Sequence, residues 1–421
     1  MNELVSRLIN VSLRGGTLAC KFLLIFFLAK FLSPEEVGLF GLIVASIGYS
    51  FFLIGFEFYT YSSRDLLGVG KESWLPIIRD QWVFFAISYA LFLPLLLFAF
   101  GAYFSSLKYV GWFLVLLLFE HTAQELNRLL VVMSEQFLAS LVLFLRSGVW
   151  AIVAVLLMGY VQEARNLDFV FLAWSIGAGA ACALGVARVL KLDKSTWNRK
   201  CDWRWILRGV KIAFPLLIAS LAIRGLFTFD RYWVESAVGL DVLGAYVLFV
   251  GVAFSIVSFL DAGVIAFLYP KVVAAAKEND EKKFKKNMKE LAVTLVLATV
   301  TMAAFALFFS PFVLSWIGKE IYLDNLYLLQ WLLLAVIIYA ASMAPHVGLY
   351  AKHHDKAILY SQVLGFLVFL IGCFIGVPMF GAIAVVWAMC VSFLVILLWK
   401  VAVYQKVCGF SSVSDRRMVD E

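Results

Sequence analysis

Hydrophobic residues dominate the chain in long stretches, and short polar segments separate these stretches. A helix needs about 20 mainly apolar residues to cross a bilayer. The pattern predicts an all-α integral membrane protein with about 12 transmembrane helices. The predicted spans are 12–33, 37–61, 81–104, 109–132, 137–160, 168–189, 210–229, 241–268, 291–317, 325–350, 356–377 and 379–404.

The composition agrees with this pattern, because 63% of the residues are hydrophobic and 15% are charged, with a mean hydropathy of +0.94. Soluble domains carry a larger charged fraction. The first apolar stretch is longer and more charged than a signal peptide, and no A-x-A-like cleavage site follows it. We therefore expect this stretch to remain as the first membrane helix.

The 35 lysines and arginines predict the orientation. Cytoplasmic loops keep an excess of positive charge. When alternate loops are grouped, 26 of these residues fall in the set that includes both termini, five fall in the other set, and four lie within spans. Both termini are therefore expected in the cytoplasm. The net charge of +7 is read as a topology signal and not as a nucleic-acid surface.

The sequence also divides into two halves, with six predicted spans in each. Residues 28–44 align without gaps with residues 234–250, which superposes Gly38 on Gly244 and Phe40 on Tyr246. Each segment is predicted to form a tight outer turn between two helices. We expect an N-terminal lobe at 1–193 with helices 1–6, a basic cytoplasmic linker at 194–209, and a C-terminal lobe at 210–421 with helices 7–12. Six helices per half make the repeat parallel, with a substrate site between the halves.

Other motifs narrow the function further. The segments 194–211 and 277–291 place aromatic or apolar residues among cations and are expected to form interfacial helices. The six cysteines show no C-x-x-C spacing, so we expect neither disulfides nor a metal site. No G-x-x-x-x-G-K-[ST] motif occurs, so the chain carries no P-loop ATPase of its own.

Four cations lie well inside the predicted spans, and the others within the span bounds lie near the ends and are counted with the loops: the four are Arg14, Lys21, Arg146 and Arg224. A charge at mid-bilayer costs at least about 2.5–3.5 kcal/mol and usually faces protein or water. Arg14 and Lys21 are seven residues apart and share one helix face. Arg14 either reaches the cytoplasmic surface or faces a cavity, and Lys21 is expected in the cavity. Arg146 and Arg224 either line the same cavity or pair with a buried acid.

Acidic residues supply candidate partners for these cations. Helix 4 carries a polar stripe in which Glu120 and Gln124, His121 and Glu125, and Glu125 and Arg128 lie three or four residues apart. The stripe must face the protein interior, where it either pairs internally or contacts substrate. Two further acids, Glu57 and Asp261, lie at corresponding ends of the repeated hairpins. Together with Glu120 they are candidates for gating or ion coupling, with Arg14 and Arg224 as possible gate partners.

Several longer segments resemble the Wzx-type polysaccharide flippases of the multidrug/oligosaccharidyl-lipid/polysaccharide exporter superfamily. They are FLSPEEVGLFGLI at the first outer turn, FTFDRYWVESAVGLDVLGAYVLF at 227–249, FLYPKV, and residues 348–393. The resemblance covers nearly the whole chain. It implies a multi-pass protein of the bacterial inner membrane that moves undecaprenyl-pyrophosphate-linked oligosaccharide repeat units to the periplasmic leaflet, for O-antigen lipopolysaccharide or another surface polysaccharide.

This substrate gives the buried cations a role. A pyrophosphate carries negative charge that must leave water, and arginine offers bidentate donors that match phosphate oxygens. Arg14, Lys21, Arg146 and Arg224 are therefore the predicted substrate-binding residues of an alternating-access transporter. Membrane lipid, a polysaccharide polymerase and a chain-length regulator are the expected partners. The chain is expected to work as a monomer, with no cofactor beyond a proton or sodium gradient.

Alternative classes fit the sequence less well. A polymerase or ligase would carry a large periplasmic loop, whereas the longest outer loop here is about a dozen residues, so we expect no enzyme activity. The loop after helix 2 lacks the glycine, aspartate and arginine pattern of major-facilitator transporters. The runner-up is a cation-coupled multidrug exporter of the same superfamily, which should favour acidic or apolar sites inside the membrane. A purely structural scaffold is a further alternative class.

Overall fold

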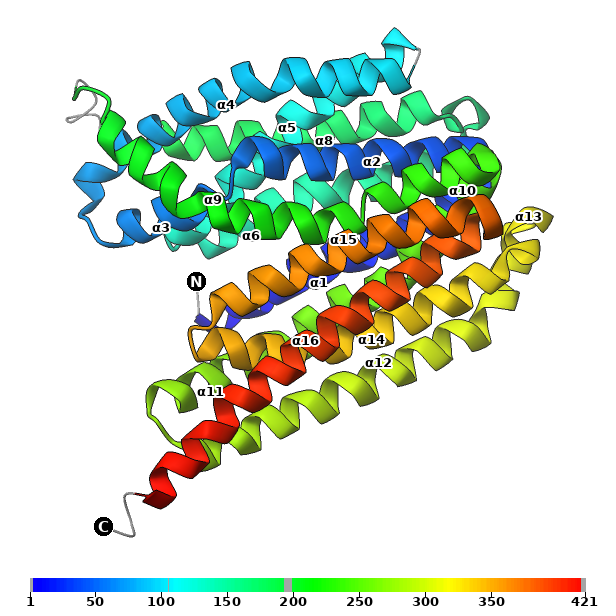
Figure 1. Cartoon of the computed structure of the whole chain (residues 1–421). Helices are drawn as coiled ribbons and strands as arrows, with labels where there is room; N and C mark the ends of the chain where they lie inside the picture. The colour runs from blue at the N-terminus through cyan, green and yellow to red at the C-terminus, as the bar shows by residue number, and fades with distance from the viewer. Residues whose placement is uncertain (1–2, 105, 193–198, 418–421) are drawn as a thin grey trace. The chain divides into compact units, whose positions relative to one another are not determined.

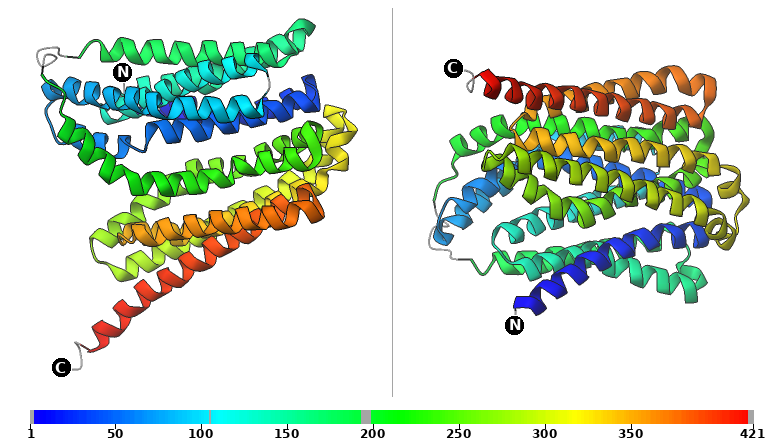
Figure 2. Two further views of the ribbon diagram at one scale, coloured as in Figure 1. Left: turned by 45° about the horizontal axis from the view of Figure 1, so that its top comes forward. Right: turned by 90° about the horizontal axis from the view of Figure 1, so that it is seen from below.

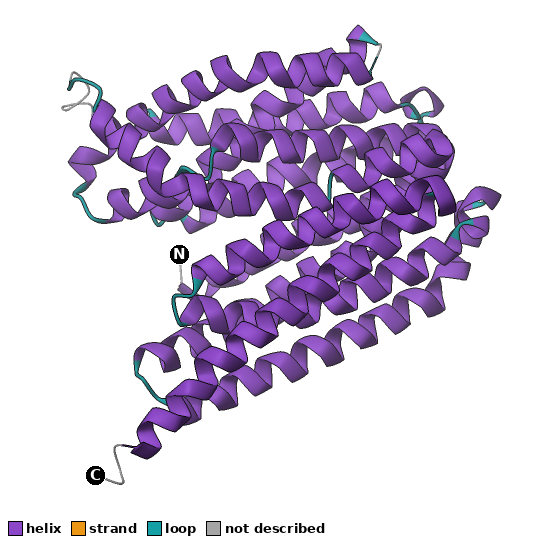
Figure 3. Ribbon diagram, viewed as in Figure 1, coloured by secondary structure: helices purple, strands orange, loops and turns teal. Residues whose placement is uncertain are grey.

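The structure, a computed structural model, describes residues 3–104, 106–192 and 199–417. These residues form helices joined by short turns, and no strand occurs among them (Figure 3). The chain folds into two compact units, Met1–Leu221 and Ala222–Glu421, which we call the first and second unit. The predicted all-helical class is confirmed.

The first unit contains the helices up to the first part of α9 (Figure 1). They are α1 (Glu3–Phe31), α2 (Pro34–Gly55), α3 (Tyr59–Leu67), α4 (Trp74–Tyr103), α5 (Leu107–Val132), α6 (Gln136–Phe144), α7 (Trp150–Tyr160), α8 (Leu167–Val189) and α9 (Trp203–Leu226). A π-helical turn, η2 (Leu145–Val149), joins α6 to α7, so that these three elements form one continuous rod. Short 3-10 turns, η1 (Lys71–Ser73) and η3 (Gln162–Ala164), precede α4 and α8.

The second unit contains the remaining helices, and those from α12 to α16, yellow to red in Figures 1 and 2, run alongside one another. They are α10 (Phe229–Leu260), α11 (Ala266–Lys277), α12 (Glu281–Ile317), α13 (Glu320–Asp324), α14 (Leu326–Ala351), α15 (Asp355–Phe380) and α16 (Ala382–Arg417). Another π-helical turn, η4 (Asp261–Ile265), joins α10 to α11.

The helices account for about twelve membrane crossings. Ten segments of the described chain are long and apolar enough to span a bilayer. One of them, Trp203–Lys277, is 75 residues long and covers two crossings, because the backbone turns at Gly239 inside α10. The more polar α5, 26 residues long, supplies the twelfth.

The predicted repeat of the first hairpin is confirmed at its turn. Ser33 caps α2: its side chain accepts a hydrogen bond from the Glu36 backbone N–H, and the Glu36 carboxylate accepts one from the Ser33 backbone N–H. The 206-residue shift places Ser33 on Gly239. Gly239 has φ 82° and ψ 178°, a conformation that favours glycine. Both segments therefore turn at the aligned position, one by a capping box and the other by a glycine.

The end of helix 2 differs from the prediction. The expected helix ran to residue 61, whereas α2 ends at Gly55 and Phe56 and Glu57 adopt left-handed φ values of 55° and 54°. The chain then restarts as α3. The same shift places Gly55 on Asp261, where the second unit changes from α-helix to the π-helical η4. Hydropathy did not reveal this interruption, because the apolar Phe56 and Phe58 flank Glu57 and extend the apolar stretch past the end of α2.

The basic segment 277–291 also differs from the prediction of an interfacial helix. Its helical part is the first turns of α12, and Phe284, Met288 and Leu291 are buried within the second unit. The ammonium of Lys352 lies 4.8 Å from the centre of the Phe284 ring. The apolar stripe of this segment therefore contacts protein, because α14 ends beside it.

The two compact units divide inside α9, at Leu221, and not at the basic linker. The first part of α9 belongs to the first unit because Ile206, Ala213 and Leu217 pack in one apolar cluster with Phe58 and Phe84. Part of the predicted linker, residues 194–198, lies outside the described residues, as does residue 193. The functional lobe boundaries at 193 and 210 stay a prediction.

Candidate functional site

The polar stripe of α5 faces the interior of the first unit, as predicted. Glu120, His121 and Glu125 are buried, and Arg128 is partly buried. Residues three and four positions apart lie on one helix face, so the stripe presents several charges to neighbouring helices over a little more than two turns. It divides into two clusters with different partners.

The first cluster, which we call the Arg146 cluster, is centred on an ion pair. Arg146 Nη2 and Nε each lie 2.7 Å from Glu120 Oε2, and Arg146 Nη1 donates a hydrogen bond to Gln124 Oε1. Trp174 on α8 donates to the other Glu120 oxygen at 2.7 Å. Arg146 and Glu120 are both buried. Of the two predicted alternatives for Arg146, the structure shows the pairing with a buried acid, which is Glu120.

The π-helical turn η2 positions Arg146. A π-bulge inserts an extra residue into a helix and often marks a functional site. Trp150 donates a hydrogen bond from Nε1 to the Arg146 backbone oxygen at 2.9 Å, which secures the turn from its C-terminal side. The indole rings of Trp150 and Trp174 stack with centroids 5.7 Å apart. Two tryptophans thus hold the two partners of the ion pair.

The two cations of α1 approach the same rod, α6–η2–α7. Lys21 lies within electrostatic reach of Arg146 and Glu120, and it is exposed. Arg14 lies nearer the N-terminus of α1, where its guanidinium donates to Ser140 Oγ and Gln136 Oε1, each at 3.4 Å. Arg14 and Lys21 were predicted to share one face of α1. In the structure, both lie toward the rod α6–η2–α7.

The charges of this region do not balance. Arg14, Lys21 and Arg146 carry three positive charges, and Glu120 carries one negative charge. The Arg146–Glu120 pair leaves the two α1 cations as the excess. An excess of positive charge beside a buried, rigid ion pair can attract an anionic group, since low local dielectric strengthens such attraction.

The second cluster lies further along α5, around Arg128. Its guanidinium is 2.5 Å from Glu125 Oε1 and lies 3.6 Å from the centre of the Tyr59 ring, so it makes both an ion pair and a cation–π contact. Gln81 of α4 donates to Glu125 Oε2 at 3.2 Å. The predicted Glu125–Arg128 pairing is confirmed. This cluster ties α3, α4 and α5 together.

His121 does not pair with Glu125 as the spacing suggested. Its Nδ1 lies 3.2 Å from the Tyr89 hydroxyl, and its Nε2 has no hydrogen-bond partner among the described residues. A Cβ added at Gly55 would lie 3.2 Å from Nε2. His121 therefore packs against the point at which α2 ends.

Glu57 lies at that same interruption. It is buried, and its Oε1 accepts a hydrogen bond from the Ser220 hydroxyl on α9 at 2.6 Å. The possible gate pair of Glu57 with Arg14 is not formed, because Arg14 contacts Ser140 and Gln136 instead. Glu57 thus joins the break in α2 to the helix that leaves the first unit.

In the second unit, the structure brings Arg224 and Asp261 to one aromatic residue. Both lie within electrostatic reach of Tyr339 on α14. Asp261 opens the π-helical η4, and both Asp261 and Arg224 are exposed. Both charges therefore lie near one residue, and their pairing and role in gating stay predictions.

Two features escaped the sequence analysis. Asp230 is fully buried, accepting a hydrogen bond from the Tyr246 hydroxyl at 2.8 Å and pairing with Arg231 at 3.1 Å. Trp174 completes the Glu120 contacts. The hydropathy pattern could not single out either residue. Asp230 lies just outside a predicted span, and Trp174 is an aromatic residue in an apolar helix.

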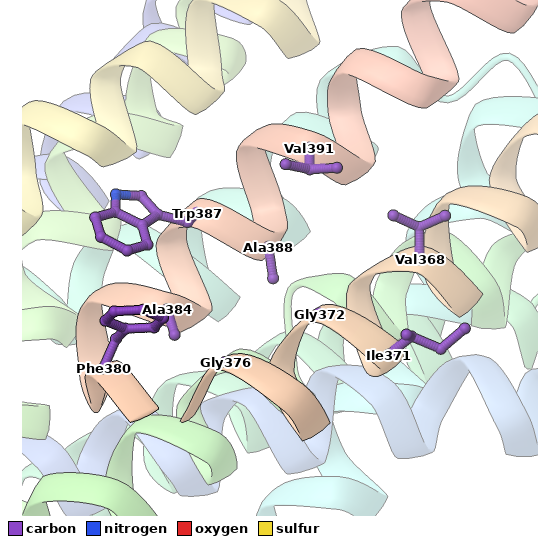
Figure 4. A pocket seen from close by; sticks show the side chains of 9 residues that line it. All are labelled: Val368, Ile371, Gly372, Gly376, Phe380, Ala384, Trp387, Ala388 and Val391. Carbon is purple, nitrogen blue, oxygen red and sulfur yellow. The ribbon is translucent and has the colours of Figure 1, made fainter. Parts of the chain in front are cut away.

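An apolar pocket lies on α15 and α16 within the second unit (Figure 4). Its volume is about 370 Å³, and its lining includes no charged residue. Gly372 and Gly376 form its floor beside Ala388 and Ala384, because a Cβ at either glycine would come within 2.9 Å of the facing alanine. Such a surface can accept hydrocarbon but offers no charged group that would bind a phosphate.

Comparisons with known proteins identify the fold. No protein-family model matches the sequence, and no curated protein matches it significantly. An inward-facing multidrug resistance MATE family transporter of the MOP superfamily has a similar structure, with a TM-score of 0.77 at 15% identity over 93% of this chain and 96% of that one.

Two further solved structures resemble the chain. The lipid II flippase MurJ, in its inward closed conformation, has a TM-score of 0.69 at 14% identity, with 94% of this chain and 87% of that one covered. MATE in complex with MaD3S has a TM-score of 0.65 at 14% identity, covering 96% and 95%. The chain therefore has the fold of these membrane transporters and flippases.

Proposed function

We propose that this chain is a flippase that moves undecaprenyl-pyrophosphate-linked oligosaccharide repeat units from the cytoplasmic to the periplasmic leaflet by alternating access. The product would serve O-antigen or another surface polysaccharide. The fold, shared with a lipid flippase and with multidrug transporters, supports a transport function. The choice of a lipid-linked anion rests on the charges of the Arg146 cluster.

The observation that supports this substrate is the excess of positive charge around Glu120. Lys21 is exposed beside the buried Arg146–Glu120 pair, and Arg14 lies on the same face of α1. A cationic drug would be repelled by this arrangement, whereas a pyrophosphate would be attracted. We propose Lys21 as the first contact for the pyrophosphate, with Arg14 beside it.

Arg146 would take a second role. Its guanidinium is occupied by Glu120 and Gln124, so it can bind phosphate oxygens only if the substrate replaces one of these partners. Glu120 would then act as a gate that releases Arg146. Arg224 and Asp261 would form the corresponding pair in the second unit. Energy would come from a proton or sodium gradient or from the substrate concentration.

The location follows from the same proposal. We propose the bacterial inner membrane, with both termini in the cytoplasm and a polymerase and chain-length regulator as partners. A cation-coupled multidrug exporter is the second candidate, favoured by the structural similarity to a MATE transporter. The two candidates differ in the charge of the transported group.

A reconstituted assay separates these candidates. Proteoliposomes containing the full chain are supplied with an undecaprenyl-pyrophosphate-linked oligosaccharide, and the fraction reaching the inner leaflet is measured with a glycosidase that acts from inside. We expect transport by the wild type and loss of at least about tenfold in Lys21→Ala, since one desolvated charge contact contributes roughly 1.5–3 kcal/mol. Lys30→Ala, on the same helix, is the matched control and should retain transport.

The drug-exporter candidate is tested in the same vesicles. If a cationic dye is exported and the lipid-linked oligosaccharide is not, the flippase proposal is wrong. If the oligosaccharide moves but Lys21→Ala moves it equally well, the flippase assignment stands and the cationic contact is refuted.

A further inference from the structure

A lysine that the sequence analysis counted with the C-terminal segment is buried inside the second unit. Lys400 lies in α16, and only 4% of its surface is exposed. No ion pair joins it to a carboxylate of the described residues, and no acid of that part of the chain influences its charge. Holding an unpaired ammonium away from water costs several kcal/mol. This residue therefore needs an explanation that packing alone does not supply.

The packing of α14 against α16 places His346 beside Lys400. The two helices run in the same direction, because Phe393 contacts Tyr339 and, further along, Tyr404 meets Gly348. Lys400 lies between Phe393 and Tyr404, so it faces the α14 segment that contains His346. The two side chains are within electrostatic reach of each other.

The remaining neighbours of Lys400 are uncharged. Helix α15 runs antiparallel to α16, as the contacts of Gly365 with Ile396 and of Gly372 with Ala388 show. This register brings Ser361 to the level of Lys400, and the Ser361 hydroxyl donates to the Ile358 backbone oxygen. From α14, the Ser342 hydroxyl is buried without a hydrogen-bond partner among the described residues.

Other titratable groups lie on the helices around this pair. Tyr360 on α15 and Tyr350 on α14 are exposed, and Tyr404 is on α16 itself, one turn beyond Lys400. From α10, Tyr246 is occupied by Asp230, and Asp261 of the adjoining η4 is near Tyr339, two turns of α14 from His346. His346 is therefore the titratable group that the packing of α14 against α16 places beside Lys400.

We propose that Lys400 and His346 form a proton-binding site in the second unit, in which the two side chains together hold one exchangeable proton. A doubly protonated pair would place two adjacent positive charges in an apolar interior, which is strongly unfavourable. A proton needs no cavity, in keeping with the close packing here. The apolar pocket ends at Val391, about two and a half turns before Lys400.

This site would give the chain a way to use a proton gradient. The sequence contains no P-loop motif, so an external energy source is required for uphill transport. When a buried group gains or loses a charge, the free energy of burying it changes. Protonation can therefore change which conformation of the unit is favoured. The inference does not depend on the proposed substrate, since it rests on side chains of the second unit alone.

The proposal can be tested by NMR on the full chain in lipid nanodiscs, labelled with ¹⁵N in histidine and lysine side chains. The chain has four histidines, so the His346 signal is identified by its loss in His346→Gln. We expect the Lys400 and His346 signals to change together between pH 5 and 9. In Lys400→Met, His346 should become charged at a pH higher by about one unit or more, because the repulsion is gone.

Two further variants keep the test decisive. Lys286→Met removes an exposed lysine of α12 and should leave the His346 midpoint unchanged. Lys400→Arg keeps a permanent charge and should hold His346 neutral over the whole range. The proposal is overturned if His346 titrates identically in the wild type and Lys400→Met. It is also overturned if inorganic phosphate at constant pH shifts both signals, since the pair would then bind an anion.

Discussion

Arg146 has two expected roles, in folding and in substrate binding, and mutation of its partner separates them. Arg146→Gln would remove the guanidinium that pairs with the buried Glu120. Breaking a buried ion pair in this way costs about 3–5 kcal/mol. We expect less folded protein in the membrane, measured by fluorescence-detection size-exclusion chromatography of a fusion to a fluorescent protein.

The double variant Arg146→Gln/Glu120→Gln removes both charges and should recover most of the folded protein, because neutral amides can hydrogen-bond to each other. Its transport activity then reports on substrate binding alone. Wild-type abundance of the single variant would show that water or another group compensates Glu120, and the buried ion pair would lose its structural role.

At the scale of single residues, the sequence predicted which charged residues form the candidate site, but it did not predict which residues they contact. Charged residues within apolar spans identified Glu120, Arg146 and Lys21, because hydrocarbon tolerates few such residues. The choice of Glu120 as the partner of Arg146, and of Tyr89 instead of Glu125 for His121, depends on how α5 is rotated toward α6 and α4. Spacing within a single helix cannot supply that rotation.

At the scale of elements, the turn at Gly239 carries a testable requirement. A residue with a Cβ is strained at φ 82° and ψ 178°, by about 1–3 kcal/mol. Space is not the limit, because nothing lies within 4 Å of an added Cβ. Gly239→Ala should therefore lower the midpoint temperature of unfolding, measured by a thermal stability assay in detergent.

Gly101→Ala is the matched control for this prediction. Gly101 lies in the helix α4, also has no atom within 4 Å of an added Cβ, and has no positive φ. Alanine is the better helix former, so this variant should be neutral or slightly stabilising. Equal unfolding temperatures for Gly239→Ala and the wild type would show that the backbone at 239 relaxes without cost.

Helix interiors were predictable at this scale and their interruptions were not. The hydropathy pattern located α4, α5 and α8 because length and apolar content alone decide whether a helix can span a bilayer. The break at Phe56–Glu57 and the π-helical turns η2 and η4 depend on contacts with other helices, such as that of Glu57 with Ser220.

At the scale of the whole molecule, the charge distribution predicts a topology that reporter fusions can check. A reporter active only in the cytoplasm should be active when fused after Lys200 or Lys283. It should be inactive after Glu163 or Leu240, because these positions follow an odd number of crossings when the N-terminus is cytoplasmic. Reporter activity in cells is the measurement.

A reporter active only in the periplasm, fused at the same four positions, is the control and should give the opposite pattern. The same activity at Glu163 and Lys200 would contradict the count of crossings between α7 and α9. The orientation would then need revision, although the helices of each unit would keep their packing.

The sequence by itself determined that this protein lies in a membrane, how many times the chain crosses that membrane, and that the first hairpin is repeated. These properties follow from local apolar content, charge and turn residues. Tertiary structure alone decided which charges meet: it paired Arg146 with Glu120, brought Arg224 and Asp261 to Tyr339, and buried Lys400 beside His346. The physical reason is that a helix can rotate about its axis without changing its hydropathy, and packing against neighbouring helices fixes that rotation.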